Sequence, residues 1–241
     1  MILCDANARV RVRRTRKFGS QLTSISARQL TLAVDVCIFI VQDRQLKLRL
    51  VRRSESPYRG RWALPGTVVA AREDLEETAR RALAEETGAA EAYLEQLYTV
   101  AKPSGDSRRA ITVVYFALTA ADKIQIRATA AAEAAGWFGM HKLPGLAADH
   151  ADMVRMARRR LVAKLDYSTI ALQFMPKRFT LSDLQSVYEI ILGETLDKRN
   201  FRKRILAFDQ IEETKEKRRG GVHRPARLYR VRRPDKVAFI K

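Results

Sequence analysis

The chain has 241 residues, enough for one large domain or two modest ones. Hydrophobic residues make up 46% and charged residues 30% of the sequence, as in globular proteins, and the apolar run at residues 32–41 is too short to cross a bilayer. These values exclude transmembrane and disordered proteins. The two cysteines form neither a CxxC nor a Cys/His pattern, so no zinc site or disulfide framework is expected. No secretory signal pattern is present, which predicts a protein that stays inside the cell.

The net charge of +19 is distributed unevenly along the chain. It amounts to +5 in residues 1–17, +1 in residues 18–154 and +13 in residues 155–241. A neutral module joined to a basic one favours polyanion binding by a single part of the chain. We therefore expect nucleic acid as the partner, with an anionic membrane surface as the less favoured alternative.

The N-terminal half predicts a mixed α/β domain. Residues 8–17 form either a basic arm that lies along phosphates or a solvated tail. Strands follow at residues 32–41 and 46–51, joined by a turn at 42–45, and a helix at residues 75–87 ends at Gly88, where glycine makes a favourable C-cap. Further strands are predicted at residues 93–100, 111–118 and around 137–138, so that the order is β-β-α-β-β-β.

The C-terminal half is helical at first and strongly basic. A basic helix at residues 149–165 leads from one domain to the other, and a second helix at residues 180–192 begins at Thr180 or Ser182 and ends at Gly193. Asp197 then caps a third helix, whose apolar residues Phe201, Ile205 and Phe208 recur at helical spacing. Strands at residues 211–215 and 227–231 flank a Gly-Gly tip. This succession is typical of a winged helix-turn-helix.

The third helix is the candidate DNA reader. A capped basic helix can enter the major groove with its N-terminus first, where Arg reads guanine and Asn reads adenine. The predicted readers are Lys198, Arg199, Asn200, Arg202 and Lys203. The arginines of the wing, expected to contact the phosphate backbone or the minor groove, are Arg218, Arg219, Arg224 and Arg227.

Residues 65–89 resemble the Nudix box. That signature has Gly, five residues, Glu, seven residues and then Arg-Glu-apolar-x-Glu-Glu-x-Gly-apolar. The matching positions are Glu73, Arg81, Leu83, Glu85, Glu86, Gly88 and Ala89. Thr67 stands where the first Gly belongs, and Ala82 where the first Glu of the helix belongs.

The spacing of positions 82, 85 and 86 places them on one helical face, where three carboxylates would hold a divalent metal. Mg²⁺ would there neutralise a diphosphate and activate water. Ala82 removes one ligand, which leaves Glu85 and Glu86 as candidates that hold Mg²⁺ weakly. The alternative is an ordinary solvated helix face on which Arg81 is the salt-bridge partner of these two glutamates.

The residues before the box are rich in arginine, with an aromatic residue among them. Arginines and an aromatic ring beside an ionic helix suit a nucleotide that carries a diphosphate. The candidates are Arg53, Arg59, Arg61, Trp62 and Arg81, of which Trp62 is equally suited to the core.

From about Leu32 to Val231 the chain resembles the bacterial Nudix-related transcriptional regulators of NAD metabolism. The most specific stretches are Phe179-Thr-Leu-Ser-Asp-Leu-Gln-Ser-Val-Tyr, Leu196-Asp-Lys-Arg-Asn-Phe-Arg-Lys and Arg224-Pro-Ala-Arg-Leu-Tyr. The resemblance implies an α/β fold, with an α-β-α sandwich around a mixed sheet, followed by a winged helix-turn-helix. It also implies a homodimer that binds a palindromic operator in double-stranded DNA and senses a nucleotide such as ADP-ribose.

The predicted parts are a basic arm (1–30), a Nudix-like domain (31–147), a connecting helix (148–166) and a winged helix-turn-helix domain (167–241). Two functions compete. One is a cytoplasmic, nucleoid-associated repressor of NAD biosynthesis or salvage genes, with a catalytically degenerate Nudix domain and no cofactor needed for DNA binding. The other is an active ADP-ribose pyrophosphatase with a basic tail. The charge of residues 155–241 and the loss of Glu at position 82 favour the repressor.

Overall fold

The computed structural model describes residues 30–56, 58–89, 92–103, 109–124, 132–218, 226–234 and 236–239. Its main sheet has the order β3-β2-β1-β6-β5, with β4 added beside β1 and β7 beside β2. The strands are β1 (Leu30–Gln42), β2 (Gln45–Arg53), β3 (Trp62–Ala63), β4 (Gly66–Val68), β5 (Tyr93–Pro103), β6 (Arg109–Leu118) and β7 (Ala132–Gly139). The pairing of β1 with β6 is parallel and the others are antiparallel, so the sheet is mixed, as expected.

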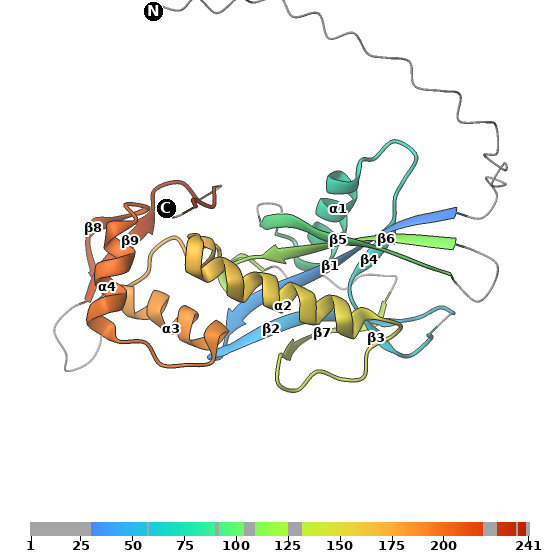
Figure 1. Cartoon of the computed structure of the whole chain (residues 1–241), viewed down its shortest axis with the longest axis horizontal. Helices are drawn as coiled ribbons and strands as arrows, with labels where there is room; N and C mark the ends of the chain where they lie inside the picture. Colours follow the sequence, from blue (N-terminus) through green and yellow to red (C-terminus); the bar gives the residue numbers. More distant parts are fainter. Residues whose placement is uncertain are drawn as a thin grey trace, which may run out of the picture.

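Helices cover both faces of this sheet (Figure 1). Alternate residues of β1 divide between the two layers: Val34, Val36 and Ile38 pack with helix α1 (Leu75–Thr87), whereas Cys37 and Phe39 belong to the core that includes helix α2 (His150–Tyr167). A strand that is buried on both sides reads as a continuous apolar run. The α-β-α sandwich is therefore present, and the short strands β3 and β4 are additions that the apolar pattern did not reveal.

The C-terminal part is a helix-turn-helix with a β-hairpin. It contains η3 (Ile170–Phe174), α3 (Leu181–Leu192), α4 (Lys198–Ala207), β8 (Ile211–Arg218) and β9 (Ala226–Val231). Thr180 caps α3 through a capping box with Asp183, Gly193 ends it in the left-handed conformation, and Asp197 caps α4. The helix-turn-helix and the hairpin were predicted from sequence, with α4 ending one residue before Phe208. The basic arm at residues 1–29 lies outside the described residues.

Helix α2 lies along the sheet and reaches the C-terminal helices (Figure 1). Its residues Val154, Ala157, Leu161 and Leu165 belong to one buried cluster that continues from the sheet into α3 and α4. A buried polar cluster ties the same helix to β5. The Arg160 guanidinium donates to Glu95 at 2.9 Å, and Lys164 donates to the same carboxylate and, at 3.1 Å, to the Tyr93 hydroxyl.

The Lys164 side chain is 8% exposed and that of Glu95 is 21% exposed. Burial opposes ionisation of Glu95, yet the hydrogen bonds from Lys164 and Tyr93 hold its pKa below the usual value. The Glu95 carboxylate therefore stays ionised in a mainly apolar layer. No helix in the described part of the chain is long and apolar enough to cross a membrane.

The cluster predicts that two acidic residues, Glu95 beside α2 and Asp152 within it, contribute differently to the free energy of unfolding. Glu95→Ala leaves the Lys164 ammonium buried without its carboxylate and should lower the free energy of unfolding by about 2–3 kcal/mol. Asp152→Ala breaks only the exposed pair with Arg155 and should cost less than about 0.5 kcal/mol. Urea unfolding followed by circular dichroism measures both, and equal losses would show that the Glu95 cluster adds nothing.

Candidate functional site

Helix α1 carries the Nudix box and is fixed at both ends. Asp74 and Glu77 form a capping box, with hydrogen bonds of 2.8 and 2.9 Å, and Gly88 ends the helix at φ 67°. The helix packs Ala79, Ala82 and Leu83 against the sheet, so position 82 is a buried small residue rather than a carboxylate. The caps and this packing decide where Glu85 and Glu86 lie.

Arg81 is engaged within the box itself. Its guanidinium donates twice to Glu73, at 2.8 and 2.9 Å, and once to the Thr67 hydroxyl at 3.2 Å. Glu85 lies 3.5 Å from the same guanidinium. The hydrogen bond from Arg81 lowers the pKa of Glu73. Thr67, the departure from the glycine of the signature, therefore supplies an acceptor for Arg81.

Glu85 and Glu86 are not equivalent, although they were predicted to share a metal-facing row. Glu85 is about half exposed, whereas Glu86 is 9% exposed and accepts a hydrogen bond from the Arg49 Nε at 3.2 Å. Arg49 is itself 3% exposed and lies over the Trp137 ring at 5.7 Å. A guanidinium thus occupies one side of the Glu86 carboxylate and supplies the positive charge there.

This donor set does not fit a Mg²⁺ ion, which needs several oxygen ligands in near-octahedral geometry. Glu73, Glu85 and Glu86 all face arginines, and Ala82 offers no oxygen. Within the described ranges, no group of three or more Asp, Glu, His or Cys residues could hold a metal ion. The weak Mg²⁺ site at Glu85 and Glu86 stays a prediction that this arrangement does not favour.

A cavity of about 570 Å³, which we call the Nudix pocket, opens beside these carboxylates. Its lining comes from the start of β1, the end of β2, the segment 63–68 and the last turns of α1. Arg53 lines it, as predicted for a ligand-binding residue, and so does Arg52, which sequence reasoning left out. The pocket therefore offers arginines and carboxylates together, a setting for a polar, anionic ligand.

The other predicted ligand residues do not line this pocket. Arg59 and Arg61 lie exposed on the loop before β3, with the Arg61 guanidinium beside Gly145. Trp62 is half-buried and packs edge-on against Phe138, with ring centroids 4.7 Å apart. For Trp62 the structure thus shows the core packing that was weighed against a role as a base platform. Ligand contact by these residues stays a prediction.

Asp35 and His150 form a buried titratable pair beside the Nudix pocket, which Asp35 lines. The Leu64 N–H donates to the His150 Nδ1 at 2.8 Å, so the proton of the neutral ring lies on Nε2, 3.8 Å from the Asp35 carboxylate. Burial raises the pKa of Asp35 to about 7, and burial lowers the pKa of His150 to about 4. A Cβ at Gly66 would lie 1.9 Å from the Asp35 carboxylate, so only glycine fits opposite it.

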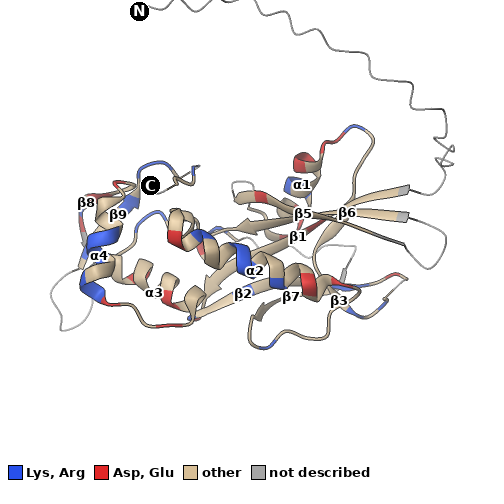
Figure 2. Cartoon of the chain, viewed as in Figure 1, with Lys and Arg blue, Asp and Glu red and all other residues tan. Residues whose placement is uncertain are grey.

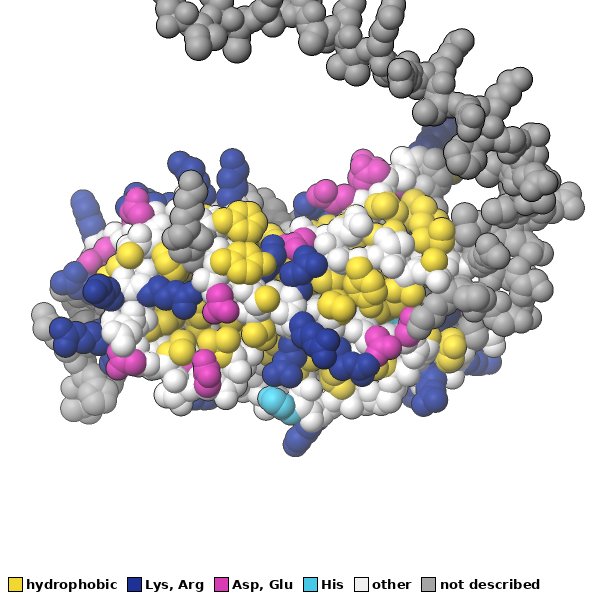
Figure 3. All heavy atoms as spheres, in the orientation of Figure 1, with side chains coloured by type: hydrophobic (Ala, Val, Ile, Leu, Met, Phe, Trp, Pro, Cys, Tyr) yellow, Lys and Arg dark blue, Asp and Glu magenta, His cyan; other side chains and the backbone are white. Residues whose placement is uncertain are grey.

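The second candidate site is the outer face of α4. Phe201 and Ile205 are buried, with the Phe201 ring packed edge-on against Tyr188 at 5.2 Å, which turns the opposite face outward. All five predicted readers, Lys198, Arg199, Asn200, Arg202 and Lys203, are exposed there. Figure 2 shows the basic residues along α4, and Figure 3 shows dark blue side chains gathered at this end of the molecule.

The outer cations of α4 differ in their pairing from Arg204 of the same helix. Across the described ranges, the side chains of Lys198, Arg199, Arg202 and Lys203 make no hydrogen bond or ion pair. Arg204 instead turns inward and donates to the carbonyls of Leu165 and Asp166 at the end of α2, at 3.1 and 2.8 Å. Unpaired cations on one helix face suit a polyanion better than a folded neighbour.

The hairpin β8–β9 is less positive than its arginines suggest. Arg227, one of the predicted wing contacts, pairs with Glu213 at 2.7 Å, and Arg230 pairs with Glu212. Arg219 and Arg224 lie outside the described residues, as does the side chain of Arg218. The described part of the wing is thus partly neutralised by its own acidic strand.

Comparisons with known proteins agree with this two-part architecture. A model of the NUDIX domain matches residues 31–159, and a model of the NrtR DNA-binding winged helix domain matches residues 171–231. The ADPR responsive transcriptional repressor NtrR of Acinetobacter baylyi is 38% identical over 211 residues, which cover 85% of this chain and 83% of that relative. The chain belongs to the NrtR family of Nudix proteins.

Solved structures of NrtR share the whole fold. The crystal structure of Shewanella oneidensis NrtR covers 87% of this chain and 97% of its own, with a TM-score of 0.77 and 35% identity. The same protein complexed with a 27mer DNA covers 85% and 94%, with a TM-score of 0.76 and 37% identity. The likeness spans both the Nudix part and the winged helix.

Besides Arg52, sequence reasoning missed three further residues of the Nudix part as site residues. Arg49 was seen only as one of the basic residues that alternate with apolar ones in the second strand, a pattern typical of a solvated face. Asp35 was noticed as a polar residue inside an apolar run, and that position was the signal of a buried functional carboxylate. His150 follows Asp149 in one of the stretches that carry the family resemblance, but that stretch indicated no chemical role for it.

The raised pKa of Asp35 predicts a pH-dependent stability difference. Its folded-state pKa of about 7 exceeds the ordinary value of 3.8, so the folded state binds the proton more tightly and this contribution to stability is lost as pH rises between these values. The loss is about 1.4 kcal/mol per pH unit. Asp35→Asn removes it, so the variant should gain stability relative to the unmodified protein from pH 4 to pH 7.

Urea unfolding at pH 4 to 8 measures this gain. The matched control is Asp122→Asn, an exposed residue with the same charge change, which should show a pH-independent difference near zero. His150 acts in the opposite direction, because its lowered pKa costs stability as pH falls from 6.5 to about 4, but it is present in both proteins and cancels in the comparison. A constant offset for Asp35→Asn across the whole range would contradict the buried-carboxylate interpretation.

Proposed function

We propose that the chain is a DNA-binding transcriptional repressor whose hold on its operator is controlled by ADP-ribose in the Nudix pocket. The observation that carries the DNA part is the unpaired cationic face of α4, displayed by a helix-turn-helix with Asp197 as the cap. The matched relative from Acinetobacter is named a repressor responsive to ADPR, and the NrtR of Shewanella has been crystallised with DNA. The Nudix pocket supplies arginines for a diphosphate.

The proposal extends to assembly and place of action. A homodimer would present two copies of α4 to a palindromic operator, in keeping with the two-fold symmetry of such sites. The regulated genes would be those of NAD biosynthesis or salvage, since ADP-ribose derives from NAD. A protein of this function would act in the cytoplasm, at the nucleoid.

The DNA test uses a double variant of α4. Arg202→Ala with Lys203→Ala removes two unpaired cations and should weaken binding to a promoter duplex by about a hundredfold. The control, Lys142→Ala with Arg159→Ala, removes the same charge from exposed positions in the Nudix part and should change affinity less than about threefold. Gel-shift titration measures both, with circular dichroism as the check on folding. Equal losses in the two variants would indicate non-specific attraction rather than a reading helix.

The Nudix part is proposed to bind ADP-ribose without turning it over and without a divalent metal. Bound Mg²⁺ would activate a water molecule there, but arginines occupy the carboxylates that would hold it. Arg49 and Arg81 already balance Glu86 and Glu73, so the affinity for ADP-ribose should not depend on a metal. The alternative function, an ADP-ribose pyrophosphatase, requires an affinity for ADP-ribose that does depend on a divalent metal.

Calorimetric titration with ADP-ribose tests this in EDTA and in excess MgCl₂. We expect dissociation constants within about twofold of each other and no release of AMP, because metal and acid-base contributions worth about a hundredfold or more are missing. The variant Thr67→Gly with Ala82→Glu returns the two departed positions to the signature, and AMP release by this variant alone would support a sensor built on a former active site. Robust hydrolysis by the unmodified protein would establish the enzyme instead.

A further inference from the structure

The hairpin β1–β2 runs from the Nudix pocket to the helix-turn-helix. At one end, Ala33 and Asp35 of β1 and the last residues of β2 line the Nudix pocket. At the other end, its turn lines a second cavity of about 210 Å³ between the Nudix part and α3. The two ends are roughly 25 Å apart along the strand, at about 3.3 Å per residue. One rigid element of the sheet therefore touches both the effector pocket and the DNA-reading part.

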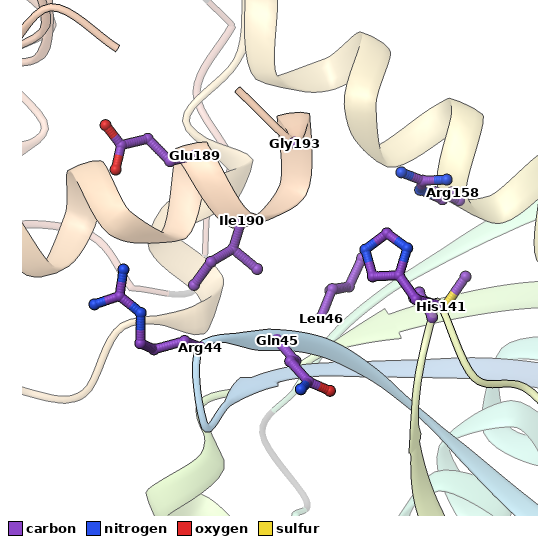
Figure 4. Close-up of a pocket in the computed structure, with 9 residues that line it drawn as sticks. Arg44, Gln45, Leu46, His141, Arg158, Glu189, Ile190 and Gly193 are labelled. Carbon is purple, nitrogen blue, oxygen red and sulfur yellow. The ribbon is translucent and has the colours of Figure 1, made fainter. Parts of the chain in front are cut away.

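The turn of this hairpin places Arg44 against α3. Asp43 and Arg44 have φ values of 49° and 55°, the left-handed pair of a two-residue hairpin turn. Arg44, Gln45 and Leu46 line the second cavity opposite Glu189 and Ile190 (Figure 4). Figure 4 shows the Arg44 side chain extending from the turn on the side of the cavity where Glu189 lies.

Glu189 in turn holds the link between α3 and α4. The backbone N–H of Leu196 and the side-chain amide of Gln185 both donate to its Oε1, each at 3.0 Å. The same Gln185 amide donates to the Leu196 carbonyl at 2.8 Å. We call these three residues, Gln185, Glu189 and Leu196, the turn clasp. Because Leu196 immediately precedes Asp197, the cap of α4, the turn clasp determines where the reading helix begins.

The groups around Glu189 favour the ionised form of its carboxylate. The hydrogen bonds from Leu196 and Gln185, aided by the charge of Arg44, lower the pKa of Glu189, which keeps its carboxylate ionised. Arg158 of α2 and His141 also line the cavity, with Arg158 extending toward His141 in Figure 4. Neither residue makes a hydrogen bond or ion pair within the described part of the chain.

We propose that Glu189 is a positioning residue for α4, and that Arg44 at the tip of β1–β2 carries the state of the Nudix pocket to it. A displacement of the hairpin by a ligand at Asp35 and Arg53 changes the position of Arg44 relative to Glu189 and so loosens or tightens the turn clasp. The inference rests on the proposed function, because it assumes that the Nudix pocket takes ADP-ribose and that α4 reads DNA. It names the residues through which one site affects the other.

Two substitutions at position 189 separate the hydrogen bond from the charge. Glu189→Gln keeps an oxygen that accepts from Leu196 but removes the attraction of Arg44, whereas Glu189→Ala removes both. Glu189→Ala should weaken binding to the promoter duplex about tenfold, as expected for loss of a hydrogen bond to a charged group. Its binding to non-specific DNA at low salt should stay unchanged, which simple unfolding would not allow. Glu194→Ala, an exposed glutamate in the same link, is the matched control and should leave both affinities unchanged.

The coupling test is a double-variant cycle with Arg44→Asn and Glu189→Gln. Asn suits the left-handed turn position, so the hairpin keeps its shape. The readout is the ratio of promoter-duplex dissociation constants with and without saturating ADP-ribose. Each single variant should bring this ratio at least threefold closer to one. The double variant should bring the ratio no closer to one than the single variants do. Arg44→Lys keeps the charge and should restore the ratio of the unmodified protein. Arg158→Ala, which removes a charge from the same cavity, should keep the unmodified ratio, and all variants should bind ADP-ribose with unchanged affinity.

The outcomes are distinguishable. If the unmodified protein neither binds the promoter duplex nor responds to ADP-ribose, the proposed function itself fails. If it does both, and Arg44→Asn keeps the full response or the two single effects multiply in the double variant, the role of Arg44 and Glu189 is overturned while the repressor stands. An equal loss of affinity in Glu189→Ala and Glu194→Ala would remove the positioning role of the turn clasp.

Discussion

Burial of the apolar face of α2 is the constraint on which the rest of this structure depends. The helix covers one face of the mixed sheet and continues into the core of the helix-turn-helix, so one buried cluster extends through both parts. Within the same layer, Lys164 donates a hydrogen bond to the Glu95 carboxylate. Because separating α2 from either part would expose that cluster, the hairpin β1–β2 stays against α3, and the Nudix pocket and α4 belong to one connected body.

The Nudix part keeps the helix of a catalytic signature, while the carboxylates of that signature face arginines. The helix, its capping box and its C-terminal glycine remain, because they serve the fold. Ala82 adds to the packing against the sheet, while Arg81 and Arg49 face the remaining carboxylates. Internal guanidinium groups thus supply countercharge to these carboxylates, beside a polar pocket that is lined by further arginines.

The outer face of α4 differs from the hairpin β8–β9 in how far its cations are paired with acidic residues. On the hairpin β8–β9, arginines meet glutamates across the strands, and on α2 Arg160 meets Glu95. On the outer face of α4, Lys198, Arg199, Arg202 and Lys203 have no partner among the described residues, whereas Arg204 is bonded to backbone carbonyls of α2. An unpaired cationic stripe of this kind gains most from phosphates, whose release of counterions drives association.

Much of this architecture followed from the sequence alone. Hydrophobic period predicted α1, α3 and α4, with Gly88 as the end of α1 and with Thr180 or Ser182 and Asp197 as the caps of the other two, because these signals act within one helical turn. The Nudix register singled out Glu73, Glu85 and Glu86, and the charge of residues 155–241 predicted the DNA-binding part. Only the tertiary structure decided that Glu86 meets Arg49, 37 residues away, that Asp35 is buried beside His150, and that Arg44 faces Glu189. These contacts join residues far apart in the chain, and their energies depend on burial, which local pattern does not specify.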